Sequence, residues 1–354
     1  MNQTTLPSDP DWSKYRLPAE WERHEATFLA WPHNAETWPG LLEAVQQTYL
    51  DIIRALLPGE KVILLATDCG AAQSIQERLE KEKIPSENLQ VVTIPNDDAW
   101  VRDSGPIFML RRDSGNPRRI AHDFIFNSWG RKYGPWDKDD VIPLAACRMT
   151  DTPCFRHDFV LEGGSLDTDG LGTLLTTEQC LLNPNRNSSH DRKAIEGRLA
   201  EWLGIRKIIW LNDGLEGDDT DGHIDDITRF LAPGVVVTVV EPDTRDANHA
   251  PLLENLQRLR HARDSRGNPL QIIELPMPPR LDGPHHRNPA SHANFYIGNS
   301  AVLVPVFQSP TDSVVLDLLR PHFPGRQVVG IDCQALVAGL GAIHCITQQM
   351  PAIV

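Results

Sequence analysis

Five short polar segments carry side chains that could do chemistry together, although they are spread over most of the chain. They supply three acids, Asp103, Glu162 and Asp225, together with His223 and Cys345. Cysteine is the strongest nucleophile among common side chains, and a positively charged neighbour increases its thiolate fraction. Cys345 is therefore the candidate nucleophile. The five segments are 100–106, 161–165, 221–226, 291–294 and 341–345.

A guanidinium compound is the substrate that these residue types fit. Its planar cation requires carboxylates to offset desolvation, and charge-assisted hydrogen bonds contribute about 1.5–3 kcal/mol each, so Asp103 and Asp225 form a reasonable binding pair. Attack by Cys345 on the guanidinium carbon gives a tetrahedral adduct, from which ammonia leaves only when protonated. His223 could supply that proton and then activate water, while Glu162 would fix its tautomer. The set predicts a metal-free hydrolase that needs no cofactor.

Between these segments the chain repeats one order of elements, strand-strand-helix-strand, and each segment precedes a strand pair. The three clearest copies are 165–167, 172–177, 190–203 and 207–211; then 227–231, 235–240, 252–262 and 272–275; then 295–297, 301–305, 311–322 and 327–331. Two weaker copies can be recognised. One consists of 107–111, 119–124 and 154–157, and the other consists of 346–347 from the end of the chain with 27–31, a helix through Val45 to Leu57 and a strand at 62–66. Five modules predict a closed radial α/β fold in one domain, 1–354, with a flexible start at 1–14. An ordinary α/β sheet is the alternative.

Charge and cysteine content restrict the partners. Forty-eight acidic against 34 basic residues give a net charge of −14, which repels nucleic acid and anionic membrane and favours cationic solutes. No apolar run reaches bilayer length and the start lacks an export signal, so we expect a cytoplasmic protein. The six cysteines have no CxxC pairing, which favours free thiols over disulfides.

Each candidate residue has an ordinary structural interpretation when it is considered alone. Asp103 could bridge a turn with Arg102, and Glu162, His223 and Asp225 could be polar turn residues. Together these interpretations weaken, because five unrelated turns would have to carry matched residues at equivalent positions by chance. For the remaining cysteines we favour the role of small core side chains, namely for Cys69, Cys147, Cys154, Cys180 and Cys333.

Several longer strings are similar to the agmatine deiminase family, a relative of the bacterial peptidylarginine deiminases in the guanidine-modifying superfamily. The resemblance runs from about position 31 to the C-terminus. It is carried by NDDAWVRDSGP (96–106), FNSWGRKYGPWDKDD (126–140), LEGGSLDTDGLGTLLTTEQCLLNPNRN (161–187), DGHIDD (221–226) and IHCITQQMP (343–351).

The resemblance implies the five-bladed α/β propeller of the pentein fold. It also implies a C–N hydrolase that converts agmatine and water to N-carbamoylputrescine and ammonia, in putrescine biosynthesis or agmatine catabolism. By position it makes Cys345 the nucleophile, His223 the acid and base, Glu162 its supporting acid, and Asp103 and Asp225 the guanidinium-binding pair. We add Trp100, beside Asp103, as a substrate-binding candidate. The expected partner is a small cationic guanidine, and a homo-oligomer is a possible assembly.

Some positions depart from the family pattern. Many members have glycine and asparagine where Leu340 and Ala342 stand, glycine in place of Arg131 and tyrosine in place of His292. Arg131 and His292 could line the pocket, and they would then affect how the far end of the substrate is recognised.

Three other functions remain open. One is deimination of another guanidine, such as peptidyl or C-terminal arginine, which an arginine facing the pocket would favour; the candidates are Arg131, Arg245, Arg280 and Arg287. A second is a metal hydrolase using His223, Asp225, Asp226, His285, His286 and His292, although it would leave Cys345 unused. The third is binding without catalysis.

Overall fold

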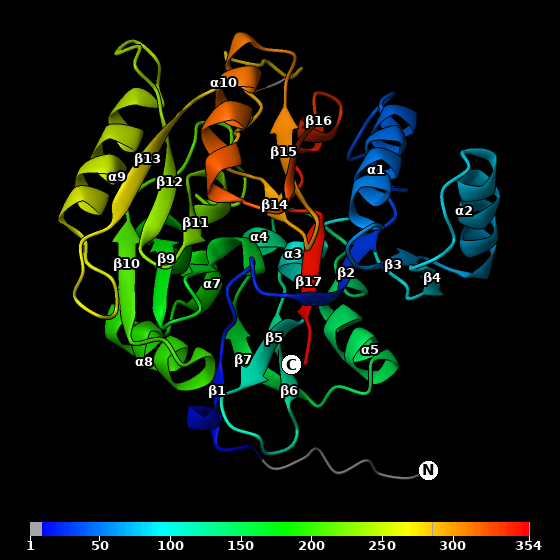
Figure 1. Ribbon diagram of the computed structural model, residues 1–354, viewed down its shortest axis with the longest axis horizontal. Coiled ribbons are helices and arrows are strands. Elements are labelled where there is room, and N and C mark those ends of the chain that lie inside the picture. The colour runs from blue at the N-terminus through cyan, green and yellow to red at the C-terminus, as the bar shows by residue number, and fades with distance from the viewer. Residues whose placement is uncertain (1–8, 285, 354) are drawn as a thin grey trace.

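Five small separate sheets make up the architecture of the computed structural model, which describes residues 9–284 and 286–353 (Figure 1). The first sheet contains β1 (Tyr15–Arg16), β5 (Ile107–Arg111), β6 (Arg119–Ile125) and β7 (Cys154–Val160). The second contains β8 (Asp167–Thr168), β9 (Thr173–Thr177) and β10 (Lys207–Leu211). The third contains β11 (Thr228–Ala232), β12 (Val235–Val240) and β13 (Gln271–Pro276), and the fourth β14 (Tyr296–Ile297), β15 (Ala301–Val306) and β16 (Gln327–Asp332). The fifth joins β17 (Thr347–Pro351) to β2 (His24–Ala30), β3 (Lys61–Ala66) and β4 (Leu89–Thr93).

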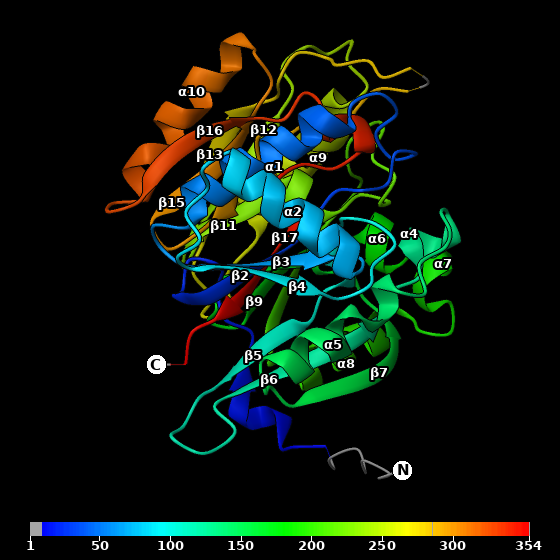
Figure 2. The ribbon, with the colours of Figure 1, turned by 90° about the vertical axis from the view of Figure 1, so that its right-hand side faces the viewer.

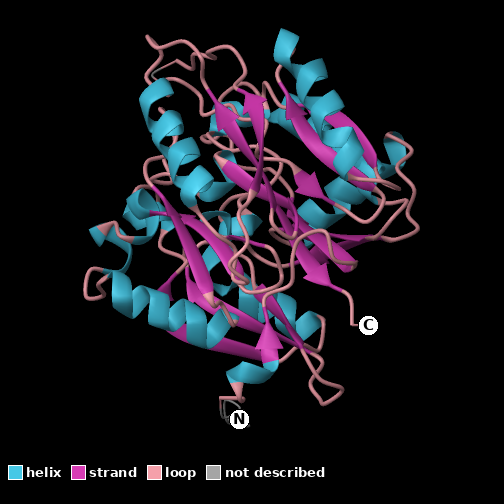
Figure 3. Cartoon of the chain, turned by 60° about the vertical axis from the view of Figure 1, so that its left-hand side comes forward, coloured by secondary structure: helices cyan, strands magenta, loops and turns pink. Residues whose placement is uncertain are grey.

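One pairing rule governs every sheet. The first two strands of each module pair antiparallel, as in β5 with β6, and the next strand along the sheet pairs parallel, as in β6 with β7. A parallel pair requires a crossover, and in each module a helix provides it. The crossover helices are α5 (Ile142–Met149), α8 (Arg192–Leu203), α9 (His249–His261), α10 (Pro310–Leu319) and α1 (Leu42–Leu56). Figure 3 shows helices on the outside of the strands.

The remaining helices are short, apart from α2 (Cys69–Lys81), which precedes the extra strand β4. They are α3 (Val101–Ser104), α4 (Ser128–Arg131), α6 (Glu178–Leu181) and α7 (Pro184–Asn187). The 3-10 helices are η1 (Trp12–Lys14), η2 (Asp139–Val141), η3 (Gly163–Ser165), η4 (Ile224–Asp226), η5 (Arg320–His322) and η6 (Leu336–Gly339). No described helix is both long enough and apolar enough to cross a membrane.

Local sequence explains why the crossover helices form and end where they do. In α1, Val45, Tyr49, Ile53 and Leu56 are spaced by three or four residues, and all four are buried on one face. In α8, the Asp191 side chain accepts a hydrogen bond from the Ala194 backbone N–H at the start. Such helices can bury one face against their own sheet and leave the other to solvent.

Apolar clusters connect the sheets in a closed order. One cluster joins the first sheet to the second, a larger one joins the second, third and fourth, another joins the fourth to the fifth, and the last joins the fifth back to the first. In that last cluster Phe28 of β2 packs with Phe108 of β5. The C-terminal strand β17 also pairs with β2, so the two ends of the chain complete one module (Figure 2). The predicted fold of five modules is therefore what the chain adopts.

The boundaries differ from prediction in a few places. The predicted helix 311–322 is two elements, α10 and η5, and the strand predicted at 165–167 begins only at Asp167 because Ser165 belongs to η3. Of the start expected to be flexible, residues 1–8 lie outside the described part. The expectation of flexibility is wrong for residues 12–14, because they form η1 and Trp12 is buried against Phe155 and His122.

Candidate active site

The loops that precede the modules meet at the centre of the ring. The Gly164 backbone N–H of η3 donates to Asp103 Oδ1 of α3 at 2.8 Å. The His344 backbone N–H donates to Asn294 Oδ1 at 2.9 Å, which ties the fourth loop to the fifth. The structure thus gathers Asp103, Glu162, His223, Asp225 and Cys345 into one buried site, although their chemical roles stay predictions.

Cys345 lies at the floor of this site, with 5% of its surface exposed. Its Sγ is 3.1 Å from the side-chain amide nitrogen of Asn294 and 3.9 Å from Asp225 Oδ2. Burial, together with the carboxylates of Asp225, Asp226 and Asp103, raises the pKa of the Cys345 thiol well above its usual value. A bound cation would counter these carboxylates and favour the thiolate.

His223 is fully buried between two acids. Its Nδ1 is 3.7 Å from Asp103 Oδ1 and its Nε2 is 4.0 Å from Glu162 Oε2, and neither ring nitrogen has a hydrogen-bond partner among the described residues. Burial opposes a charge on the ring, but Asp103, Cys180 and Asp225 outweigh it and raise the pKa of His223 well above its usual value. These carboxylates favour the protonated ring, which is the form that a general acid needs.

Glu162 is fixed beside His223 by an arginine. Arg186 Nε donates to Glu162 Oε1 at 2.7 Å, and the same guanidinium donates to the backbone carbonyls of Thr220 and Trp129. Glu162 Oε2 has no hydrogen-bond partner among the described residues and faces His223. One carboxylate oxygen is thus held by the protein, and the other remains available to the histidine.

The two predicted guanidinium-binding acids are held differently. Asp103 accepts hydrogen bonds on both oxygens, from Gly164 N–H at 2.8 Å and from Trp129 Nε1 at 2.9 Å, yet burial raises its pKa. Asp225 has a lowered pKa: burial opposes this, but a hydrogen bond and the charge of His344 outweigh burial. Asp225 Oδ1 is buried and has no partner in the described part of the chain. That oxygen is an open acceptor, while Oδ2 of the same carboxylate lies 3.9 Å from Cys345 Sγ.

Trp129 owes its position to an unusual turn. In α4 the residues Ser128, Trp129 and Arg131 all have positive φ values, 53°, 53° and 65°, which non-glycine residues rarely adopt. The Asn127 side chain accepts from Gly130 N–H at 2.8 Å and stabilises the turn. The turn places the indole N–H against Asp103.

A cavity of about 360 Å³ is lined both by the buried Cys345 and by exposed residues such as Glu36 and Tyr133. Trp100, which we predicted to bind substrate, lines it together with the aromatic residues Trp129, Trp136 and Tyr133. Its acidic lining residues are Glu36, Asp97, Asp98, Asp103, Asp139 and Asp219. No arginine or lysine occurs among the described residues that line it. The cavity suits a cation with an apolar stem.

Two residues expected near the pocket lie elsewhere. His292 is buried, with its ring nitrogens facing the Pro305 carbonyl oxygen at 2.9 Å and the Thr311 hydroxyl at 3.0 Å, and it does not line the cavity. Arg131 is exposed and is also absent from the lining. Leu340 does line the cavity, and its φ of 72° explains why a glycine would suit that position.

Sequence reasoning missed several members of the site. Asn294 sits in the fourth predicted loop and Trp129 in a quoted string, so both had a positional signal, but Glu20 had none. Cys180, assigned to the core, is indeed fully buried, yet its thiol lies against His223.

Two groups of side chains could hold a metal ion, Glu162 with Cys180 and His223, and Asp225 with Asp226 and Cys345. Both overlap the predicted catalytic set, and the absence of a metal remains a prediction. Of the other predicted metal ligands, His286 lines the cavity and His285 lies outside the described residues.

Comparison with known proteins identifies the family. The model of the Porphyromonas-type peptidyl-arginine deiminases matches residues 16–351. The chain belongs to this family. Among relatives, the agmatine deiminase of Stutzerimonas stutzeri is 37% identical over 372 residues, which covers 99% of each protein. The solved agmatine deiminase of Enterococcus faecalis is 31% identical with a TM-score of 0.91 and covers 99% of both chains. A substrate-bound agmatine deiminase of C. jejuni is 30% identical with a TM-score of 0.86, covering 96% of this chain and 97% of that chain. Family membership thus agrees with the resemblance carried by the sequence strings.

Proposed function

We propose that the protein hydrolyses agmatine to N-carbamoylputrescine and ammonia through a covalent intermediate on Cys345. The observation that carries this proposal is the cavity that Cys345 lines, which has acidic and aromatic side chains and no arginine or lysine in its described lining. Agmatine has a guanidinium at one end, an amine at the other and an apolar chain between. Both ends are cations, so the acidic side chains of the lining suit them.

The guanidinium would lie over Cys345 between Asp103 and Asp225. Asp225 Oδ1 is unpaired and buried, and an N–H donor from the substrate would satisfy it. The positive charge offsets the carboxylates that raise the pKa of the thiol, so substrate binding favours the thiolate that attacks. The thiol proton leaves to solvent.

Two successive additions complete the reaction. The thiolate adds to the guanidinium carbon, protonated His223 gives its proton to a terminal nitrogen, and the C–N bond breaks to release ammonia. His223, now neutral, takes a proton from water as the oxygen adds to the amidino-thioether. The second adduct releases its hydroxyl proton to solvent, the C–S bond breaks, and the urea-type product and the thiolate separate. Glu162 Oε2 favours the protonated form of His223 that starts the first addition and that the second addition restores.

The distal amine would lie at the mouth of the cavity. Asp219 lines the cavity and accepts a hydrogen bond from the hydroxyl of the exposed Tyr133, and Asp98 is also part of the lining. A C-terminal arginine would instead bring a carboxylate to this acidic region. None of the arginines considered for that substrate lines the cavity: Arg245 and Arg280 are 87% and 50% exposed, and Arg287 pairs with Glu216 and Asp246.

All six cysteines are free thiols, which fits a reducing compartment, and we place the reaction in the cytoplasm. The activity is tested by ammonia release from agmatine, arginine and a short peptide ending in arginine. We expect turnover of agmatine only. Acid quenching during turnover, followed by peptide mass spectrometry, should find Cys345 heavier by agmatine less ammonia, and the Cys345→Ser variant should show no adduct. A folded protein that releases no ammonia from agmatine would overturn the proposal.

A further inference from the structure

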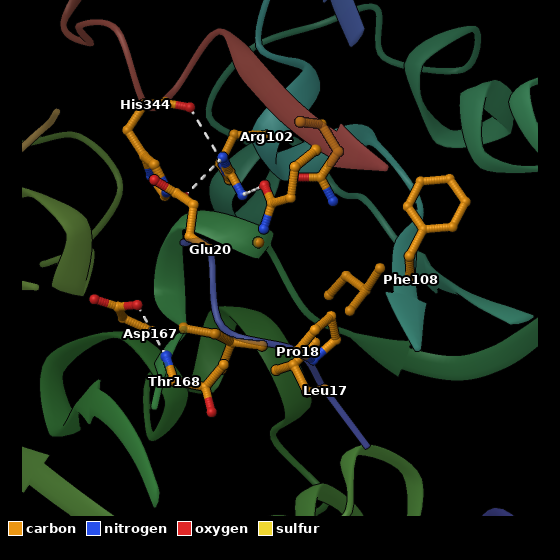
Figure 4. A pocket seen from close by; sticks show the side chains of 13 residues that line it. Leu17, Pro18, Glu20, Arg102, Phe108, Asp167, Thr168 and His344 are labelled. Atoms are coloured by element: carbon orange, nitrogen blue, oxygen red, sulfur yellow. Dashed lines mark hydrogen bonds and ion pairs between the residues drawn. The ribbon is translucent and has the colours of Figure 1, made fainter. Parts of the chain in front are cut away.

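His344, the residue before the nucleophile, is held between two carboxylates. Its Nδ1 is 2.6 Å from Asp225 Oδ2 and its Nε2 is 2.7 Å from Glu20 Oε2. The side chain is only 2% exposed and borders a second cavity of about 50 Å³, separate from the substrate cavity (Figure 4). This ring therefore links the guanidinium-binding acid to a residue near the start of the chain.

The contacts define the charge of this ring. Ionised carboxylates only accept hydrogen bonds, so both ring nitrogens of His344 must carry hydrogen, which is the imidazolium form. Glu20 is a well-anchored partner, because Arg229 is 2.9 Å from its Oε1, Arg102 is 3.4 Å from its Oε2, and the Ile297 backbone N–H donates to it at 2.8 Å. Figure 4 shows the Glu20 side chain between those of Arg102 and His344. The carboxylate that pairs with the imidazolium is thus itself held in place.

The geometry of Asp225 follows from this anchor. His344 contacts Oδ2, the oxygen that lies 3.9 Å from Cys345 Sγ, so the carboxylate plane is fixed and buried Oδ1 is left without a partner among the described residues. Both nitrogens of His344 are already committed, and the nearest polar group to Cys345 Sγ is the amide of Asn294 rather than this ring. His344 is consequently poorly placed to be a base for the thiol, despite its adjacency in sequence.

We propose that His344 is a positioning residue for substrate binding: its imidazolium holds Asp225 in the orientation and charge state that bind the guanidinium, with Glu20 as the anchor. The proposal rests on the proposed function, since it assigns the step that His344 supports. Removing His344 should weaken the affinity for agmatine and leave the chemical step, which depends on Cys345 and His223, much less affected.

Two substitutions separate the two hydrogen bonds. In His344→Asn the amide nitrogen occupies the place of Nδ1 and can still donate to Asp225, whereas in His344→Gln it occupies the place of Nε2 and can still donate to Glu20. Neither carries the positive charge. We expect the KM for agmatine to rise about tenfold to a hundredfold in His344→Gln, because this variant loses a hydrogen bond between charged groups. The rise should be smaller in His344→Asn. In both variants kcat should stay within about threefold of the native value. His157→Gln is the matched control and should keep the native KM, because His157 is a buried histidine of β7 whose ring contacts His122, Phe124 and Trp202.

The pH profile provides a readout that a purely structural role would not move. Asp225 has a lowered pKa in the folded protein, so agmatine binding persists as pH falls until that pKa is reached. Without the imidazolium the loss should begin at a higher pH in both variants. The other charged or titratable groups facing Asp225 are His223, Arg229, Asp103, Asp226 and Cys345, and those facing His344 are Glu20 and Asp167, with Arg102 and Arg229 behind them. All of these stay unchanged in the comparison.

Calorimetric titration in a Cys345→Ala background separates binding from turnover. If Cys345→Ala does not bind agmatine, the proposed function fails. If it binds agmatine equally well with and without His344, over the same pH range, the positioning role of His344 is refuted while the proposed function stands. A folded His344→Gln protein with a native KM and a large loss of kcat would also overturn the inference, because His344 would then act in the chemical step.

Discussion

Gly164 is the residue whose replacement should disturb the site most with the smallest chemical change. A Cβ added to Gly164 would lie 2.5 Å from His223 Nδ1, 2.8 Å from Asp103 Oδ1 and 3.1 Å from Asp225 Oδ2. The first of these is about 0.9 Å short of the 3.4 Å at which ordinary contact begins. In Gly164→Ala the histidine ring must therefore move by most of an ångström or tilt away.

The expected cost falls mainly on catalysis. Overpacking a buried site costs about 1–3 kcal/mol of folding free energy. A misplacement of about 1 Å in a catalytic group costs roughly a hundredfold in rate. We expect the kcat/KM for agmatine to fall about a hundredfold in Gly164→Ala, with the midpoint of urea unfolding reduced but the cooperative transition kept. Ammonia release measures the first quantity, and circular dichroism measures the second.

Gly197 provides the control. It lies within α8, and a Cβ there would have no atom within 4 Å, so Gly197→Ala should raise the stability by about 0.5–1 kcal/mol and leave turnover unchanged. If Gly164→Ala retains turnover within twofold of the native protein while folded, the close packing of His223 and Asp103 is not needed for catalysis and the assignment of their roles is wrong.

Three further predictions use other parts of the structure. Trp129→Phe removes the N–H that donates to Asp103 at 2.9 Å and keeps the ring, so kcat/KM should fall about tenfold with little change in melting temperature; unchanged kinetics would contradict the role of the indole. Burial and neighbouring carboxylates raise the pKa of Cys345, so alkylation of the free protein, followed by mass spectrometry, should be slow at pH 7 and still accelerate above pH 9; a plateau below pH 8 would oppose this. Burial lowers the pKa of His122 to about 3 and of His157 to about 4, both below the ordinary 6.5. The folded state therefore binds fewer protons than the unfolded state at mildly acidic pH. As pH falls from about 6.5 towards 4, the free energy of unfolding should decrease by up to about 1.4 kcal/mol per pH unit for each ring. Urea unfolding between pH 7 and 5 should show a shallower decrease in His157→Gln, and an equal slope would refute the assignment.

The repeated strand-strand-helix-strand order was predictable because each element has a local pattern. The alternation of turns and apolar runs gave the order, and it remained recognisable although the copies share no sequence. Pairings between distant segments gave no such signal. Nothing local indicates that Tyr15 lies opposite Arg111 in the first sheet, or that Trp12 is buried. Those contacts depend on how the closed ring brings the start of the chain against its first complete module.

The site residues also fall into two groups, those that the sequence predicts and those that it does not. Asp103, Glu162, His223 and Cys345 were predictable because each sits in a loop at an equivalent point of its module and each has a residue type with a chemical use. Their support was not predictable. Trp129 depends on a turn with three positive φ values at non-glycine residues, and no simple pattern in sequence predicts such a turn.

Electrostatics explains why so many acids can lie buried together at the centre of the ring. Each desolvated carboxylate is costly unless a positive group or N–H donors face it, and each of the central acids has such partners here. Arg186 faces Glu162, Arg229 faces Glu20 and Asp167, and His344 faces Asp225. Yet Glu162 Oε2 and Asp225 Oδ1 are buried and have no hydrogen-bond partner among the described residues. The protein's own cations compensate one oxygen of Glu162 and of Asp225 and leave the other open. In the proposed reaction the guanidinium supplies the charge that completes the site, so the binding energy of the substrate would be directed at the carbon that Cys345 attacks.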